Sequence, residues 1–185
     1  MQMMVLSRLL GKKSRIRKSS GQLLSSASQQ SRHPAFYSDR GLSDSLDGRF
    51  ESITLHIALI MRRLKSVQPS GAALAEDLCT ALFSSFDHAF REMGTSDVAI
   101  ARKIRQLGEA YAGRVAAYND SLSSEDALQS LEAAILRNVF GGDSTRDAAQ
   151  FAKYTLAADT ALAKQSDDAV WNGQINWPDP ADILN

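Results

Sequence analysis

Cysteine is almost absent from the sequence. Its 185 residues include one cysteine, Cys79, and three histidines. A single cysteine excludes an intrachain disulfide framework and any metal site built from several thiolates. Cys79 lies among Leu78, Ala81 and Leu82, so we expect a small buried hydrophobic residue rather than a reactive thiol. This low cysteine content is typical of a reducing compartment.

Motifs for catalysis are also missing. The sequence has no Glu-x-x-His pair for a di-iron bundle, no His-Glu-x-x-His zinc helix, no Walker loop and no Gly-x-Gly-x-x-Gly turn. Nothing in the spacing places Cys79 beside a histidine as a nucleophile and its base. The sequence therefore predicts a protein without catalytic activity, bound metal or cofactor.

Long apolar runs are absent as well. The longest, ITLHIALIM (53–61), is interrupted by His56 and is far shorter than the roughly 20 residues that span a bilayer. We therefore expect no transmembrane helix. His56 lies between the two apolar faces of this segment, and we expect it to be hydrogen-bonded in the core rather than to act as a ligand or a switch.

Acidic residues are absent from positions 1–33, which carry seven Lys and Arg, whereas 34–185 has fourteen basic and twenty-one acidic residues. Ser and Gln dominate 19–31, so we expect 1–33 to be a disordered leader. A second interpretation is a short amphipathic helix on an anionic membrane. Its apolar face would consist of Met4, Leu6, Leu9 and Leu10. The composition also resembles a mitochondrial presequence, and contact with ribosomal RNA through this arm is a further alternative.

Proline is absent between Pro69 and Pro178, and β-type alternation is missing. Apolar residues at helical spacing predict helices at about 44–66, 71–93, 97–120, 124–140 and 145–165. The predicted fold is therefore all-α, a compact bundle of about five helices in one domain, 34–166. The tail, 167–185, contains Trp171 and Trp177 without a helical period, and we expect it to pack on the bundle rather than to bind a partner.

Residues 87–97, DHAFREMGTSD, mark the corner between the second and third predicted helices. Gly94 is expected to end one helix, and the side chain of Thr95 or Ser96 to cap the next. This segment and the following IARKIRQLGEAYAGRVAAY (100–118) resemble the ubiquinol–cytochrome c chaperone family. Three further segments agree with that family: PAFYSD (34–39), DGRFESITLHIALIMRRL (47–64) and ILRNVFGG (135–142).

The resemblance covers about 34–142 well and the last helix and tail more loosely. Arg102 stands where the family has lysine, and Ala112 where a second aromatic often follows Tyr111. The leader has no counterpart. The resemblance implies a non-catalytic assembly factor of respiratory complex III, in its single-domain bacterial form, that binds newly made cytochrome b.

The same resemblance implies a small co-chaperone and the ribosome as partners. Contact with an anionic membrane is expected instead from the basic, partly apolar composition of residues 1–33. The acidity of 34–185 argues against binding to DNA. It places the protein in the bacterial cytoplasm, at the inner face of the plasma membrane. The presequence-like leader keeps the mitochondrial matrix or inner membrane as the alternative.

The candidate partner-binding set has eight residues. Seven are carried over from the resemblance, and Lys103 is a neighbour of one of them: Arg49, Asp87, Arg91, Asp97, Arg102, Lys103, Arg114 and Tyr118. Local structure offers another explanation for several. Asp87 and Arg91 are an i, i+4 pair, and Asp97 falls in a first helical turn, where the helix dipole favours an acid. Arg114 either pairs with a carboxylate in the bundle or presents its guanidinium to a partner.

Two functions follow. A client-binding chaperone predicts exposed apolar residues around the first helix and residues 94–118. A helical adaptor or small-ligand module without a membrane-protein client predicts a closed pocket.

Overall fold

The computed structural model describes residues 2–68 and 71–184, with side chains described from residue 11 onward. Within these ranges it is all-helical and has no strand, so the predicted class is confirmed. The five predicted helices correspond to α2 (Leu46–Leu64), α3 (Gly71–Glu92), α4 (Asp97–Leu122), α5 (Ala127–Asn138) and α6 (Ala148–Ala163). Two more helices, α1 (Gln2–Gln30) and α7 (Asp167–Trp171), bring the described count to seven.

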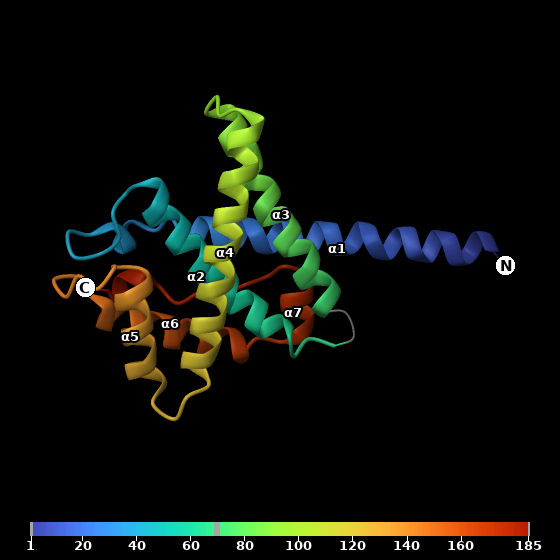
Figure 1. Cartoon of the computed structure of the whole chain (residues 1–185). Helices are drawn as coiled ribbons and strands as arrows, with labels where there is room; N and C mark the ends of the chain where they lie inside the picture. Colours follow the sequence, from blue (N-terminus) through green and yellow to red (C-terminus); the bar gives the residue numbers. More distant parts are fainter. Residues whose placement is uncertain (1, 69–70, 185) are drawn as a thin grey trace.

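Helix α2 is the centre of the bundle. The Ser45 side chain accepts a hydrogen bond from the Gly48 backbone N–H, which caps the helix N-terminus. Every residue from Ser52 to Ile60 is buried, so the helix is covered on all faces, and its neighbours are α1, α3, α4 and α6. Helices α3 and α4 form a hairpin whose tip points away from the rest of the molecule (Figure 1).

The predicted disorder of the leader is wrong for its described part, because α1 is one continuous helix. Leu23 and Ala27, one turn apart, are fully buried, and the small Ser19 and Ser20 let α1 approach α3 closely. Ser20 Oγ also donates a hydrogen bond to the Asp77 carboxylate of α3. The serine-rich composition that suggested disorder is the surface through which α1 packs.

The N-terminal part of α1 extends beyond the bundle (Figure 1). Residues 11–15 are exposed, and burial begins near Ile16. The side chains of the proposed amphipathic segment, Met4 to Leu10, lie outside the described residues.

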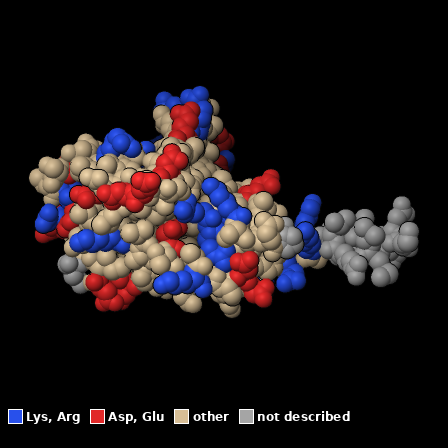
Figure 2. Space-filling view, turned by 90° about the horizontal axis from the view of Figure 1, so that it is seen from below, with Lys and Arg blue, Asp and Glu red and all other residues tan. Residues whose placement is uncertain are grey.

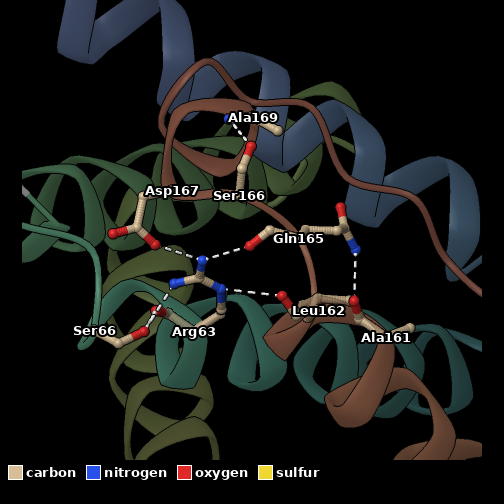
Figure 3. A network of polar contacts seen from close by, with 8 residues as sticks. All are labelled: Arg63, Ser66, Ala161, Leu162, Gln165, Ser166, Asp167 and Ala169. Atoms are coloured by element: carbon tan, nitrogen blue, oxygen red, sulfur yellow. Dashed lines mark hydrogen bonds and ion pairs between the residues drawn. The ribbon is translucent and has the colours of Figure 1, made fainter.

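After α6 the chain turns beside Arg63 of α2, whose side chain is 8% exposed. Its guanidinium donates to the backbone oxygens of Leu162 (3.0 Å) and Gln165 (2.7 Å) and to the Asp167 carboxylate (2.6 Å), as Figure 3 shows. Ser166 then caps α7 by accepting from the Ala169 N–H. Arg63 therefore satisfies carbonyls at the end of α6 and fixes the direction in which the tail leaves.

The tail is not irregular throughout, since α7 and a 3-10 turn, Pro180–Asp182, lie within it. Trp177 Nε1 donates to Ser26 Oγ on α1 (3.0 Å), and the indole ring stands edge-on to His56, 5.0 Å between centroids. His56 is fully buried; its ring nitrogens bond to Ser52 O (2.7 Å) and Tyr154 Oη (2.9 Å). The predicted core position of His56 is confirmed, and α1, α2, α6 and the tail meet around it.

Candidate partner-binding groove

A groove of about 460 Å³ opens between α1, α2, α3 and α4. Helices α2 and α3 contribute the largest shares of its wall, and the apolar residues of α3 past Leu82 are left at least partly exposed. Two hydrophobic side chains on it are largely exposed, Leu46 at 61% and Met93 at 55%. The other apolar lining residues are Leu24, Phe50, Ile53, Leu82, Phe86, Ala89, Phe90 and Leu107.

Three cations border this apolar surface: Arg32 from the segment after α1, Arg49 from α2 and Lys103 from α4. The only acidic residue among its described lining is Asp47. Lys103 Nζ lies 5.2 Å from the Phe90 ring centroid, a cation–π contact that holds the amine over the groove wall. Arg49 is exposed and pairs with Asp44 at 2.8 Å. The groove therefore suits an apolar partner segment that carries negative charge at its edges.

Asp87, Arg91 and Asp97 form a triad at the tip of the α3–α4 hairpin. Arg91 Nε donates to Asp87 Oδ2 at 2.7 Å and Nη1 donates to Asp97 Oδ1 at 2.5 Å, so one guanidinium bridges both helices. These two carboxylates raise the pKa of Arg91. Between them Gly94 has φ +74°, which ends α3 as predicted.

The predicted N-cap position at this corner is confirmed, but without the side-chain hydrogen bond. Ser96 is the N-cap residue of α4, but its side chain makes no capping hydrogen bond. The Arg91–Asp97 ion pair supplies the link across the corner instead, while Asp97 occupies the first turn of α4.

Arg114 and Tyr118 lie inside the bundle rather than on the groove. Arg114 donates to both oxygens of Glu51, at 2.8 and 3.2 Å, and to Asn138 O at 2.8 Å. Burial raises the pKa of Glu51 despite this arginine. Tyr118 is 1% exposed, and its hydroxyl has no hydrogen-bond partner among the described residues. Burial also raises the Tyr118 pKa, so its hydroxyl stays protonated.

Of the eight candidate residues, the structure thus brings Arg49 and Lys103 to the groove and gathers three at the hairpin tip. Arg102 is exposed and makes no ion pair with the described residues.

Residues 38–177 match the ubiquinol-cytochrome C chaperone family. The chain belongs to this family. Its structure is also similar to the crystal structure of the Cbp3 homolog from Brucella abortus, with a TM-score of 0.83 and 28% sequence identity. That match covers 97% of this chain and 99% of the other, which agrees with the predicted single-domain bacterial form. No curated protein matches the sequence.

Helix α1 and the two residues that follow it contribute a wall of this chaperone's groove that sequence reasoning missed, namely Leu24, Ser28, Ser31 and Arg32. The sequence predicted a disordered leader whose contacts were with a membrane or RNA, and not with a groove in the bundle. The available signal was the pair Leu23 and Ala27 one turn apart, followed by Ser31 at the next turn, which is the stripe that the structure buries.

Within the described residues, the chaperone has no group of three or more His, Cys, Asp or Glu side chains arranged to hold a metal ion. None of the described helices combines the length and the apolar character needed to cross a membrane.

Proposed function

We propose that this chaperone is a non-catalytic assembly factor of ubiquinol–cytochrome c reductase that binds newly made cytochrome b in the groove between α1 and α4. Family membership supports the assembly role. The observation that carries the client proposal is the groove itself, an apolar surface with Leu46 and Met93 exposed at its mouth. Exposed apolar surface of this kind marks sites for protein or membrane contacts.

The chemistry of the groove fits a segment of a membrane protein that has not yet packed. Such a segment exposes apolar side chains, and their burial against Phe86, Phe90 and Met93 contributes about 25 cal/mol per Å² of apolar area. The cations Arg32, Arg49 and Lys103 attract acidic residues that flank the apolar stretch. Release then requires only that the client finds better apolar partners in the assembling complex.

We further propose peripheral contact with an anionic membrane through α1. Its described side chains include five exposed cations, none of which forms an ion pair with a described residue: Lys12, Lys13, Arg15, Arg17 and Lys18. Near an anionic leaflet each contributes about 1 kcal/mol of attraction. This contact fits a chaperone in the bacterial cytoplasm at the inner face of the plasma membrane, with the mitochondrial inner membrane as the alternative. The ribosome and a small co-chaperone remain proposed partners.

Deletion of the gene tests the assembly role. Difference spectroscopy of membranes should show a loss of the b-type haem signal of complex III, together with its c-type signal. Normal complex III content in the deletion strain would overturn the proposal.

A matched pair of variants tests the groove. Met93→Asp places a charge on the groove wall, whereas Val98→Asp makes the same change at a residue that is 85% exposed and does not line the groove. Capture of cytochrome b by the tagged chaperone should fall severalfold for Met93→Asp and stay normal for Val98→Asp. Equal capture by both variants would place the client elsewhere.

A small-ligand module is the second candidate, because about 460 Å³ lies within the size range of ligand pockets. That function predicted a closed pocket, whereas this groove is open at Leu46 and Met93. The deletion experiment separates the two, since a ligand module leaves complex III content unchanged.

A further inference from the structure

A second pocket, of about 330 Å³, lies between α1 and the segment that follows α7. All its described lining side chains are polar, two of them are cations, and none is acidic: Arg15, Lys18, Ser19, Gln22, Asn172 and Gln174. The four residues from α1 are spaced i, i+3, i+4 and i+7, so they share one face of the helix. On the visible face in Figure 2, basic side chains gather where this helix leaves the body.

The pocket concentrates hydrogen-bond donors that have no partner. Ser19 is only 6% exposed, yet its hydroxyl makes no hydrogen bond with a described residue, and neither do the side-chain amides of Gln22 and Gln174. Arg15 and Lys18 form no ion pair with described residues. The side chains of Arg15, Lys18, Gln22 and Gln174 are exposed, so their donors are open to a ligand that approaches from solvent. A ligand rich in acceptor oxygens and negative charge would satisfy all five.

The wall opposite α1 is held rigidly. Gly173 has φ +76°, and a Cβ at this position would lie 2.5 Å from Gln22 Cβ and 2.9 Å from Ser19 O. Asn172 Nδ2 donates to Asp168 O at 2.8 Å, and the Gln174 N–H donates to Ala169 O at 2.9 Å. The two walls are therefore pressed together before any ligand arrives, which reduces the entropy lost on binding.

We propose that this pocket binds a phosphate ester, presented by the headgroup of an anionic phospholipid. Arg15 and Lys18 supply charge-assisted donors, and Ser19, Gln22 and Gln174 supply neutral ones. The neighbouring Lys12 and Lys13 extend the positive charge along the projecting part of α1, where a flat anionic surface can reach it. The lipid as the source of the phosphate rests on the membrane contact proposed above, whereas the phosphate site itself does not.

Vesicle flotation with the full chain tests the lipid source. The probes are vesicles of equal parts phosphatidylglycerol and phosphatidylcholine, compared with phosphatidylcholine alone. Arg15→Gln/Lys18→Gln and Lys12→Gln/Lys13→Gln remove the same charge, but only the first changes the pocket. We expect the pocket double variant to lose several times more affinity than the control. Gln22→Leu keeps the charge and removes one donor, so we expect about a fivefold loss with an unchanged salt dependence.

Titration with soluble glycerol phosphate, followed by NMR of the Gln22 and Gln174 side-chain amides, tests the pocket without a membrane. Saturable shifts that are lost in Arg15→Gln/Lys18→Gln support the site, and support a free phosphate ester as its source if the vesicles are not bound. If the two double variants lost vesicle affinity equally and glycerol phosphate caused no NMR shifts, the site would be overturned. Only a diffuse electrostatic attraction between α1 and the membrane would remain. The proposal would also be overturned if Arg15→Gln/Lys18→Gln weakened binding of a single-stranded RNA oligonucleotide but weakened neither vesicle binding nor glycerol phosphate binding. Thermal unfolding by circular dichroism confirms that each variant folds.

Discussion

Arg114 on α4 donates two hydrogen bonds to the Glu51 carboxylate on α2, from Nη2 to Oε1 at 2.8 Å and from Nε to Oε2 at 3.2 Å. The two side chains are 24% and 12% exposed, and Arg114 also donates to Asn138 O on α5. One guanidinium therefore joins three helices, which is the structural alternative that the sequence left open for this residue.

Arg114→Ala should lower the free energy of unfolding by about 2 kcal/mol, because it leaves the Glu51 carboxylate partly buried without its partner. Urea denaturation measures this loss. Arg102→Ala, which removes an exposed arginine without an ion pair, serves as the control and should change stability by less than about 0.5 kcal/mol. Unchanged stability of Arg114→Ala together with lost capture of cytochrome b would instead favour a direct role in binding.

The stability of the protein should fall as the pH drops below the ordinary pKa of histidine. Burial lowers the pKa of His56 to about 4 from 6.5, so the unfolded state binds the proton more tightly than the folded state. The contribution of His56 is therefore complete above about pH 6.5 and is lost progressively as the pH falls toward about 4. The full difference corresponds to about 3 kcal/mol, of which about 1 kcal/mol is lost between about pH 7 and pH 5.5.

Urea denaturation at these two pH values checks the prediction. His56→Gln should be less stable at neutral pH and should show a smaller loss on acidification than the wild type. His88→Gln removes an exposed histidine and should retain the wild-type loss. A loss of the same size in His56→Gln would assign the acid sensitivity to other groups.

Alanine substitutions at two glycines with positive φ distinguish the cost of backbone strain from the cost of a steric collision. At Gly141, φ is +59° and nothing lies within 4 Å of an added Cβ, so Gly141→Ala should lower stability by about 1 kcal/mol through conformation alone. At Gly173, φ is +76° and the Cβ would collide with Gln22 and the Ser19 backbone, so Gly173→Ala should lower it by about 3 kcal/mol. Thermal unfolding ranks the pair, and equal losses would mean that the tail moves away from α1 without penalty.

The Arg91 triad should contribute little to stability, because all three of its charges are exposed to solvent. Arg91→Ala is expected to lower the free energy of unfolding only slightly, and added salt should remove most of that difference. Chemical denaturation at low and high ionic strength measures both effects. A loss of several kcal/mol would show that the hairpin tip depends on this bridge.

The sequence predicted helices best where apolar spacing alone decides structure. The stripe of α2 and the Gly94 stop placed helix ends within a few residues of those observed. Helix α1 was missed because its buried contacts use small residues, Ser19, Ser20 and Ala27, whose composition is also that of disordered chains. Tertiary packing against α3 decides between these outcomes, and the short stripe of Leu23 and Ala27 is the one local sign of it.

The candidate site was predictable only in part for the same reason. Lys103 and Arg49 were named from the sequence, but the groove depends on Phe86, Phe90 and Met93, which the neighbouring helices leave at least partly exposed. For Arg114 the sequence left open a carboxylate in the bundle or a partner, and only the placement of Glu51 and α5 around it decides for the carboxylate. Which side of an amphipathic helix stays uncovered depends on the arrangement of all its neighbours.

The hydrogen bond from Trp177 to Ser26 joins residues 151 positions apart, which affects how the protein folds during synthesis. On the ribosome, α1 is made before the Trp177 segment and cannot complete its packing until that segment has left the exit tunnel. The nascent chain therefore holds an unfinished surface on α1 for the whole of this interval, and chains halted before Trp177 should be selectively exposed to proteases.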